Sequence, residues 1–222
     1  MYHMFNQAKR FLVTVTLVMS GLAYALQAHA NDSEWLAASE VVSDSTHAMI
    51  ELLKHEREEA IRKSEITGTP VGLDEQALLA QMAIILDPVV DFESIAKGVM
   101  AKFYRRASAE QIEAFNASFR TSLLNTYSRA VVAFKINNYE VHPNVSSSTK
   151  PGRQKVWVKV YANGAAYNIT YAVKLRPQGW KVTNVTLDGI NLGLAFRQQF
   201  AAAMAQNKGN MDDVIAFWLN PA

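Results

Sequence analysis

WKVTNVTLDGINLGLAFRQQF, from Trp180 to Phe200, changes its hydrophobic period within one short stretch. Apolar and polar residues alternate in WKVTNV, which indicates a strand, and Asp188-Gly189 indicates the turn that ends it. After the turn, the apolar positions Leu192 and Phe196 have helical spacing and lead to Phe200. The stretch therefore predicts a strand, a tight turn and the start of a helix, and it holds no group typical of catalysis.

The first thirty residues have the features of an export signal. Lys9-Arg10 precedes an apolar run from Phe11 to Ala25, and Ala28-His29-Ala30 fits the small-residue cleavage pattern. The apolar run is shorter than the ~20 residues that a membrane-spanning helix requires. We therefore expect cleavage after Ala30.

The composition of the remaining chain limits its class. It contains no cysteine, which excludes disulfides, zinc thiolate sites and thiol nucleophiles. The leader contains two of the 22 Lys and Arg residues and none of the 20 Asp and Glu residues. The rest of the chain therefore contains 20 basic and 20 acidic residues. This balance does not favour a nucleic-acid partner. We expect a leader at 1–30 and a single soluble periplasmic domain at 31–222.

The first half of this domain is predicted to be helical. Residues 33–65 contain neither glycine nor proline and predict one long helix, which Thr67-Gly68-Thr69-Pro70 ends. A second helix is expected at 73–86, and a short third helix begins after Asp91, whose carboxylate is placed to cap it. Ser108 and Gln111 form a capping-box pattern at the start of a long amphipathic helix.

The second half is predicted to be a sheet followed by two helices. Period-two alternation indicates strands at 139–148, around 156–160, at 167–175 and from Trp180. Asn163-Gly164 is typical of a hairpin turn. Two helices are expected at 192–207 and 211–219. The predicted fold class is α+β: a four-stranded, possibly five-stranded, antiparallel meander covered by about six helices in a cone-like arrangement.

The chain offers few groups suited to catalysis or metal binding. His47, Glu51 and His55 share one face of the first long helix, but the two histidines are two turns apart and cannot share one ion without distortion. A solvated polar face explains them better. The sequence contains no phosphate-binding loop, nucleophile elbow or H-E-x-x-H motif. We expect no catalytic residue, no metal and no cofactor.

Basic residues gather in three places that could meet a phosphate, although a solvated face is the commoner explanation: Lys102 with Arg105 and Arg106, Arg153 with Lys155, and Arg197 with Lys181. The aromatic residues run along apolar stripes and do not interleave with basic residues as they do in nucleic-acid platforms. A cone of apolar helices and an apolar sheet either fills its interior or leaves an apolar cavity. The residues alone leave both possibilities open.

Two ordered blocks resemble one protein family. The run DPVVDFESIAKGVMAKFYRRASAEQIEAFNASFRTSLLNTYSRAV, from Asp87 to Val131, resembles the helical half of MlaC-type periplasmic phospholipid-binding proteins, also called the toluene-tolerance auxiliary family. The block from Trp180 to Phe200 resembles the C-terminal signature of that family. The blocks stand in the order and spacing of the family, and together they cover much of the chain after the leader.

The chain departs from the pattern of this family at a few positions. The family usually has aspartate where Asn184 stands, serine at Asn191 and tyrosine at Phe196. Tyr104 stands where a tryptophan is common, and Ala101 replaces a frequent glycine. These departures leave the expected fold and ligand class unchanged.

The resemblance implies a periplasmic carrier of glycerophospholipids that maintains the lipid asymmetry of the outer membrane. Its partners would be an outer-membrane lipoprotein–porin complex and an inner-membrane ABC transporter with an MCE-domain subunit. The bound lipid would be cargo, and the protein would be a monomer without enzymatic activity. Two alternatives stay open: an enzyme on the same scaffold acting on an apolar substrate, and an adaptor or chaperone with a closed core.

Under this interpretation, acyl chains lie between apolar helical stripes and the inward face of the sheet. The helical positions are Ile95, Val99, Phe103, Tyr104, Phe119, Leu123, Tyr127 and Val131. The sheet positions are Val158, Val160, Ile169, Tyr171 and Val173. Candidates for headgroup contact or partner docking are Arg105, Arg106, Arg153 and Lys155.

Overall fold

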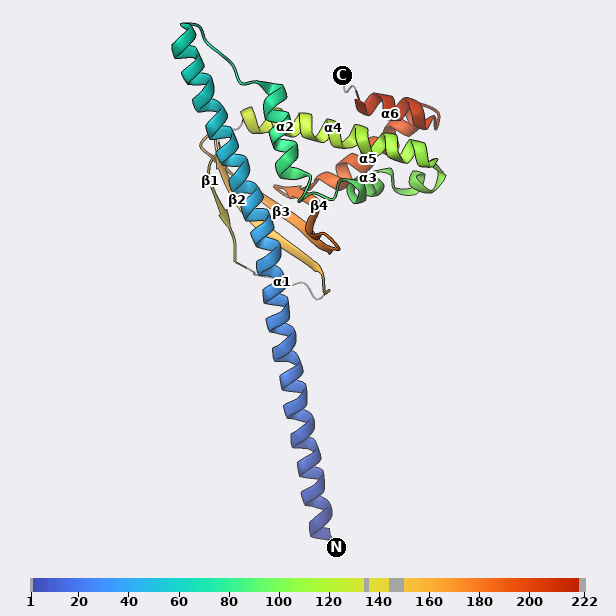
Figure 1. Ribbon diagram of the computed structural model, residues 1–222. Helices are drawn as coiled ribbons and strands as arrows, with labels where there is room; N and C mark the ends of the chain where they lie inside the picture. The colour runs from blue at the N-terminus through green and yellow to red at the C-terminus, as the bar shows by residue number, and fades with distance from the viewer. Residues whose placement is uncertain (1, 134–135, 144–149, 220–222) are drawn as a thin grey trace.

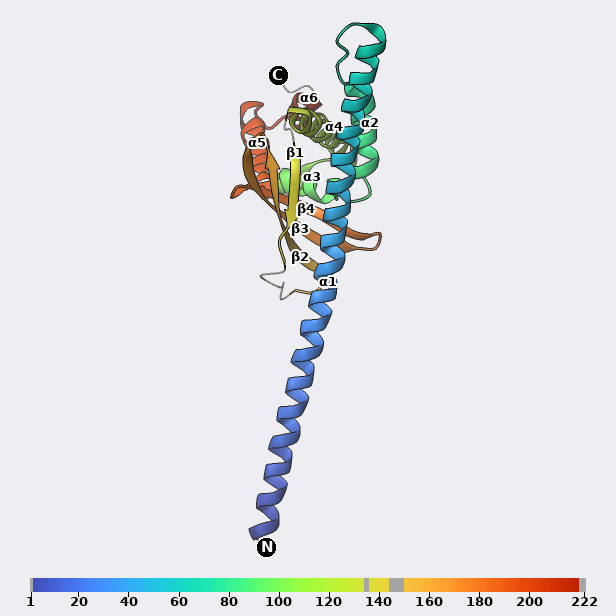
Figure 2. The same cartoon turned by 90° about the vertical axis from the view of Figure 1, so that its left-hand side faces the viewer.

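The computed structural model describes residues 2–133, 136–143 and 150–219, and gives the backbone alone for residues 2–31, 129–133, 137 and 219. Within this range the chain forms six α-helices, one 3₁₀-helix and a five-stranded antiparallel sheet. Helix α1 crosses the sheet, and α3 to α6 gather beyond the β4 edge (Figures 1 and 2). The predicted α+β class is confirmed, and the sheet has the fifth strand that the prediction allowed.

Helix α1 extends from Tyr2 to Thr67 without interruption. It contains the predicted helix at 33–65 and continues toward the N-terminus across Ala30, so that its first half projects away from the rest of the molecule (Figure 1). Within the described part of the chain, no helix combines the length and the apolar character that crossing a bilayer demands. Cleavage after Ala30 remains a prediction.

Short local signals place the next helices where the sequence predicts them: α2 at Glu75–Leu86, α3 at Phe92–Met100, 3₁₀-helix η1 at Ala101–Arg106 and α4 at Ala109–Ala133. Asp91 caps α3 by accepting a hydrogen bond from the Ser94 N–H at 3.0 Å. The capping box is confirmed, because the Ser108 and Gln111 side chains each accept a hydrogen bond from the other's backbone N–H, at 3.2 and 3.1 Å.

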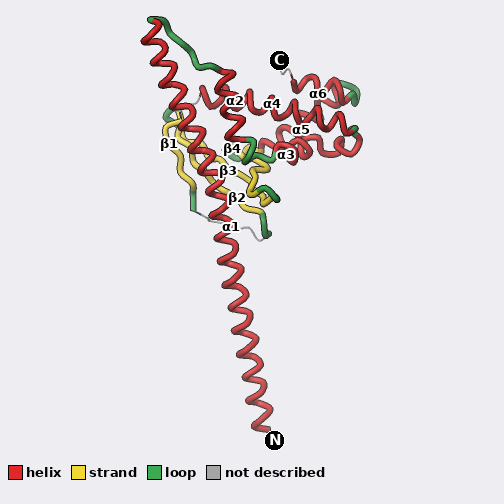
Figure 3. The backbone as a smooth tube through the Cα atoms, in the orientation of Figure 1, coloured by secondary structure: helices red, strands yellow, loops and turns green. Residues whose placement is uncertain are grey.

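The five strands form a meander in the order β1-β2-β3-β4-β5, and Figure 3 draws them in yellow. They are β1 at Ile136–Val141, β2 at Arg153–Ala162, β3 at Ala165–Arg176, β4 at Gly179–Leu187 and β5 at Ile190–Asn191. The first strand starts three residues before the predicted Tyr139 and ends at Val141, and residues 144–149 of that prediction lie outside the described residues. The missed start follows from the polar Asn137-Asn138 pair, which hides the alternation.

The Trp180–Phe200 stretch forms the predicted strand, turn and helix. Asp188 and Gly189 have φ angles of 45° and 84°, which suit a tight turn between β4 and β5. Helix α5, Leu192–Gln206, begins with two of its N–H groups bound by asparagine side chains. Asn191 accepts from the Leu194 N–H at 2.9 Å and Asn184 from the Gly193 N–H at 3.1 Å. The helix end is thereby fixed to the middle of β4.

The buried side chains form separate clusters. One fills the space among α3, α4, α5 and α6, which ends the described chain at Met211–Leu219; it includes Phe115, Phe119, Phe200 and Trp218. Another lies between α1 and the sheet and includes Val42 and Val156. A smaller one joins α1 to α2. Each cluster buries its own apolar surface, so the helical cluster and the sheet cluster are packed independently.

A second attachment of the helical cluster to the sheet, besides that of α5 to Asn184, lies before α3. Asp91 donates its backbone N–H to the Val182 carbonyl at 2.9 Å, and Val182 donates to the Val89 carbonyl at 2.8 Å. The carboxylate of Asp91 forms an ion pair with Arg176 at 2.8 Å, and Arg176 also donates to the Ser94 hydroxyl at 2.9 Å. Asp91 therefore caps α3 and ties it to the β3–β4 hairpin.

The conformation of Ala101 suits the glycine that the family often has there. Its φ of 49° and ψ of −119° lie in a region that L-residues with a Cβ atom rarely occupy. We expect Ala101→Gly to raise the free energy of unfolding by roughly 1 kcal/mol, because glycine relieves this strain. Urea unfolding measures it. The matched change Ala107→Gly, at an ordinary φ of −79°, should lower stability instead. A loss at both positions would contradict the strain at Ala101.

The ion pair of Asp91 predicts a pH dependence. Burial alone would raise the pKa of this carboxyl, but hydrogen bonds from Ser94 and Arg176 and the charge of Arg176 outweigh it, so that the net pKa lies below 3.8. Because the pKa of Asp91 is lower in the folded than in the unfolded state, its ionised carboxyl stabilises the fold at pH values above the unfolded-state pKa. This stabilisation is lost as the pH falls through the folded-state pKa.

Asp91→Asn keeps a side chain that can cap a helix but removes the charge. We expect the wild type to exceed this variant by about 1–2 kcal/mol in unfolding free energy at pH 7. The two curves should converge as pH falls from the unfolded-state pKa of about 3.9 through the lower folded-state pKa. A difference that stays constant from neutral to acidic pH would show that the ion pair contributes nothing.

Candidate functional site

The five sheet residues predicted to line a cavity share one face. Strand pairing places Val158 opposite Ile169, Gln154 opposite Val173 and Val160 opposite Tyr167. Tyr171 pairs with Val156 on the same face. This inner face is the one that α1 crosses, with Ala38 and Val42 packed against it.

Helix α1 covers the inner face unevenly. Val156, Val158 and Val173 have at most 1% of their surface exposed, and the fully buried Ala38 of α1 packs in the same cluster. Ile169 and Tyr171 stay partly accessible, as do residues of β4 beside them, although they are part of the same apolar cluster. The β3–β4 side of the inner face therefore keeps apolar surface that no side chain of the described residues fully covers.

Tyr127 of α4 identifies where this accessible surface lies. Its side chain is 43% exposed, yet burial raises the pKa of its hydroxyl, and no hydrogen bond from the described residues offsets that rise. A ring that stays accessible while the surrounding protein desolvates its hydroxyl is expected on a concave surface. We infer from this combination that Tyr127 borders a hollow within the molecule.

Tyr171 faces the same hollow from the sheet. The pKa of its hydroxyl is raised by burial first and by the nearby Tyr127 hydroxyl second, while a hydrogen bond with Thr46 acts in the opposite direction. The Thr46 hydroxyl also donates to the Val42 carbonyl at 2.7 Å, so Thr46 links Tyr171 to the backbone of α1. We call the space bordered by Thr46, Tyr127 and Tyr171 the tyrosine hollow; it is bounded by α1, α4 and β3.

The other predicted helical residues whose side chains are described lie in or against the packed cluster among α3 to α6, and not at the tyrosine hollow. Val99 is 1% exposed and Phe119 is fully buried. Phe119 contacts the rings of Phe115, Phe196 and Trp218 at centroid distances of 5.5–5.6 Å. The remaining predicted residues pack partly buried against this cluster: Ile95, Phe103, Tyr104 and Leu123. Val131 lies in α4, but its side chain is outside the described ones.

The predicted basic residues are not brought together. Arg105 and Arg106 are exposed at the end of η1. Arg153 and Lys155 are exposed on β2, where they alternate with the buried Gln154 and Val156 and so point away from the inner face. The two pairs therefore lie on different surfaces, and Arg153 and Lys155 are on the side of the sheet opposite the tyrosine hollow.

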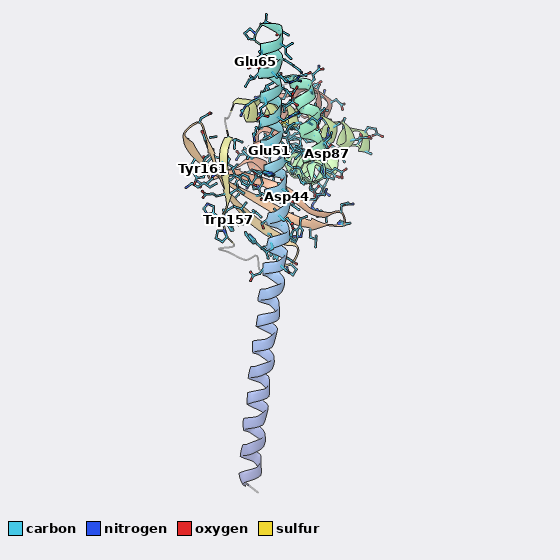
Figure 4. All side chains as sticks on the ribbon, turned by 60° about the vertical axis from the view of Figure 1, so that its left-hand side comes forward. Asp44, Glu51, Glu65, Asp87, Trp157 and Tyr161 are labelled. Carbon is cyan, nitrogen blue, oxygen red and sulfur yellow. The ribbon has the colours of Figure 1, made fainter. Side chains whose placement is uncertain are left out.

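The polar face of α1 carries the histidines. His47, Glu51 and His55 are all exposed, and Figure 4 shows Asp44 and Glu51 along this helix. Among the described side chains, no three His, Cys, Asp or Glu residues come close enough to hold a metal ion.

Sequence reasoning missed two features of the sheet and α1. Thr46 contributes the hydroxyl that fixes Tyr171, but a single threonine in a long helix carries no signal of such a contact. The outward side of β2 presents Lys155, Trp157, Lys159 and Tyr161 in succession. The expectation that aromatic and basic residues do not interleave is therefore wrong for this strand. The alternation of the strand itself could have revealed it.

Comparison with known proteins identifies the family. Residues 67–220, well over half of the chain, match the family model described as MlaC protein. The chain belongs to the MlaC family. The matched range contains α2 to α6, the whole sheet and both blocks on which the resemblance rests, whereas almost all of α1 precedes it.

Two proteins similar to this MlaC-family chain are informative. The toluene tolerance protein Ttg2D of Pseudomonas putida is 38% identical over 136 residues, which cover 60% of this chain and 62% of that protein. A phospholipid-binding protein from Ralstonia solanacearum, solved in complex with a phospholipid, superposes with a TM-score of 0.66 at 21% identity. That match covers 82% of this chain and 98% of the other, and it shows a common fold.

The difference between the filled cluster and the tyrosine hollow predicts different costs of truncation. Phe119→Ala should lower the unfolding free energy by about 3–5 kcal/mol, because it leaves a cavity in a fully packed site. Tyr127→Ala should lower the unfolding free energy by less than half of that amount, because the Tyr127 ring already borders the tyrosine hollow. Denaturant unfolding of both variants measures the difference. Equal losses would mean that Tyr127 is an ordinary core residue.

Proposed function

We propose that this MlaC-family protein is a periplasmic carrier that binds glycerophospholipids with their acyl chains in the tyrosine hollow. The observation that carries the proposal is Tyr127, an accessible ring whose hydroxyl is cut off from bulk water. The accessible apolar surface of Ile169 and Tyr171 beside it suits acyl chains. The family membership and the fold shared with a phospholipid-binding protein support the same ligand class.

The physics of lipid transfer explains why such a hollow is useful. Each buried CH₂ group contributes roughly 0.8 kcal/mol, so exposing two long acyl chains to water costs more than ~20 kcal/mol. A protein that encloses the chains during transfer removes most of that barrier without ATP. The phosphate stays at the surface, because burying an unpaired charge is prohibitive.

The two tyrosines give the hollow a specific polar character. Both hydroxyls are protonated at physiological pH, as an unperturbed tyrosine is, and burial raises their pKa values further. A neutral hydroxyl donates a hydrogen bond without adding a charge to an apolar space, so Tyr127 can bind an ester carbonyl oxygen of the lipid. Tyr171, held by Thr46, lies beside it. We propose that the glycerol esters lie at the tyrosines and the chains along the inner sheet face.

The wider transport role rests on the family resemblance. We propose that the leader is removed after Ala30 and that the mature carrier works in the periplasm as a monomer. It exchanges lipid with an outer-membrane lipoprotein–porin complex and with an inner-membrane ABC transporter that has an MCE-domain subunit. It acts as a carrier, not as an enzyme, and the lipid leaves chemically unchanged.

Organic extraction and mass spectrometry of the purified, exported protein test the ligand. We expect intact phospholipid in stoichiometric amount. An empty protein would overturn the proposal in favour of an adaptor or chaperone with a closed core. Extracted lyso-lipid with free fatty acid in equal amounts would overturn it in favour of an enzyme.

Tyr127→Glu tests the location of the ligand. The position is accessible enough to accept glutamate without collapse of a packed core, but a carboxylate in the hollow would face the acyl chains. We expect the bound lipid to fall on the order of tenfold while the circular dichroism spectrum and cooperative unfolding are retained. Phe217→Glu is the matched control, because Phe217 of α6 is 46% exposed and lies away from the hollow. Equal lipid content in both variants would place the ligand elsewhere.

A further inference from the structure

The outer face of the sheet, turned away from α1, carries a basic and aromatic surface. Its members alternate with the buried residues of β2 and continue across β3 and β4 by strand pairing: Arg153, Lys155, Trp157, Lys159, Tyr161, Lys174 and Lys181. We call these seven residues the cationic sheet face. Figure 4 shows Trp157 and Tyr161 on the side of the sheet away from α1.

Three cations of this face lie side by side across three strands. Arg153 pairs with Lys174, and Lys174 pairs with Lys181. Like charges directly opposite one another destabilise a sheet. This row of three cations contains no acidic residue, so the repulsion among the cations is not offset within the row. Such an arrangement is expected where an outside partner supplies the opposite charge.

The basic side chains of this face are not neutralised within the described residues. The ion pairs there join Arg62 to Glu59, Arg120 to Asp87 and Arg176 to Asp91, and none involves the cationic sheet face. Lys181 donates to the Pro88 carbonyl, which is uncharged. One acidic residue, Glu140, stands opposite Lys159 at the β1 edge.

The charge is segregated across the molecule. Residues 136–191 contain seven basic and two acidic residues, whereas residues 32–67 of α1 contain four basic and nine acidic ones. Residues 136–191 therefore carry a net charge of +5, and residues 32–67 carry a net charge of −5. The cationic sheet face is the part of the molecule that an anionic surface would attract.

The aromatic residues of the face favour one kind of anionic surface. Trp157 and Tyr161 are partly exposed, and the Lys159 ammonium lies 5.5 Å from the centre of the Tyr161 ring. Tryptophan and tyrosine prefer the headgroup level of a bilayer, where their rings meet apolar and polar surroundings at once. Lysine and arginine beside them are attracted to anionic lipid headgroups.

We infer that the cationic sheet face docks this protein on the surface of an anionic phospholipid bilayer. The inference goes beyond the proposed carriage of lipid, because it concerns a surface on the opposite side of the sheet from the tyrosine hollow. Docking in this orientation leaves the hollow and α1 turned toward the aqueous side. An acidic protein surface would match the charge as well, and protein that ignores anionic vesicles would favour that partner over the bilayer.

Vesicle co-sedimentation of the exported protein tests the docking. We expect binding to vesicles that contain phosphatidylglycerol, at least about tenfold weaker binding to phosphatidylcholine alone, and loss of the difference at high salt. The double variant Lys155→Gln with Lys174→Gln should weaken binding to the anionic vesicles by about tenfold or more, since each basic residue adds to the attraction. Trp157→Ala should weaken binding at both low and high salt.

The control variant is Lys54→Gln with Lys63→Gln, which removes the same charge from exposed positions of α1 and should bind anionic vesicles like the wild type. The lipid content of every variant, measured by extraction, should stay at the wild-type level. Wild-type protein that ignores phosphatidylglycerol, or an equal loss in the control, would overturn the docking. Protein that docks but purifies without lipid would overturn the carrier function alone.

Discussion

The junction at Val89 to Asp91 is the contact on which the arrangement of this molecule depends. It hydrogen-bonds the segment before α3 to the edge of β4, and the Asp91 carboxylate then binds Arg176 from the hairpin beyond. Two clusters of buried side chains, each packed by its own residues, are held together there. Beside these clusters, apolar surface of Ile169 and Tyr171 stays partly accessible. The inferred tyrosine hollow lies there, where α1, α4 and β3 meet.

Local signals in the sequence predicted most elements of the fold. Capping by Asp91 and Ser108, the turn at Asp188-Gly189 and the change of period after it all depend on neighbours a few residues away. The strands followed from alternation, and the sheet face of Val158 and Tyr171 followed with them. The start of β1 was not predicted, because polar residues mask its alternation. The uninterrupted length of α1 was not predicted either, because the leader was treated as a separate segment although no local break separates it from the helix.

The division of the helical residues between core and hollow could not be predicted. Phe119 and Tyr127 are eight residues apart on one apolar stripe of α4, and periodicity gives them the same role. In the structure, Phe119 meets rings from α5 and α6, whereas Tyr127 lies beyond the reach of those helices and approaches β3. The distinction depends on where the C-terminal helices end in space. Contacts between residues nearly a hundred positions apart carry no signature in a single sequence.

The opposite charges of α1 and the sheet have an effect that net charge does not describe. Residues 31–222 contain equal numbers of acidic and basic residues, so the field of a membrane or of a charged partner exerts little net pull on that part of the chain. Separated charge of this size nevertheless forms a large electric dipole, and a dipole in a field experiences a torque. The field of the charged surface therefore orients the molecule before it attracts the molecule. For the carrier proposed above, this separation of charge sets the orientation in which the protein approaches a donor surface.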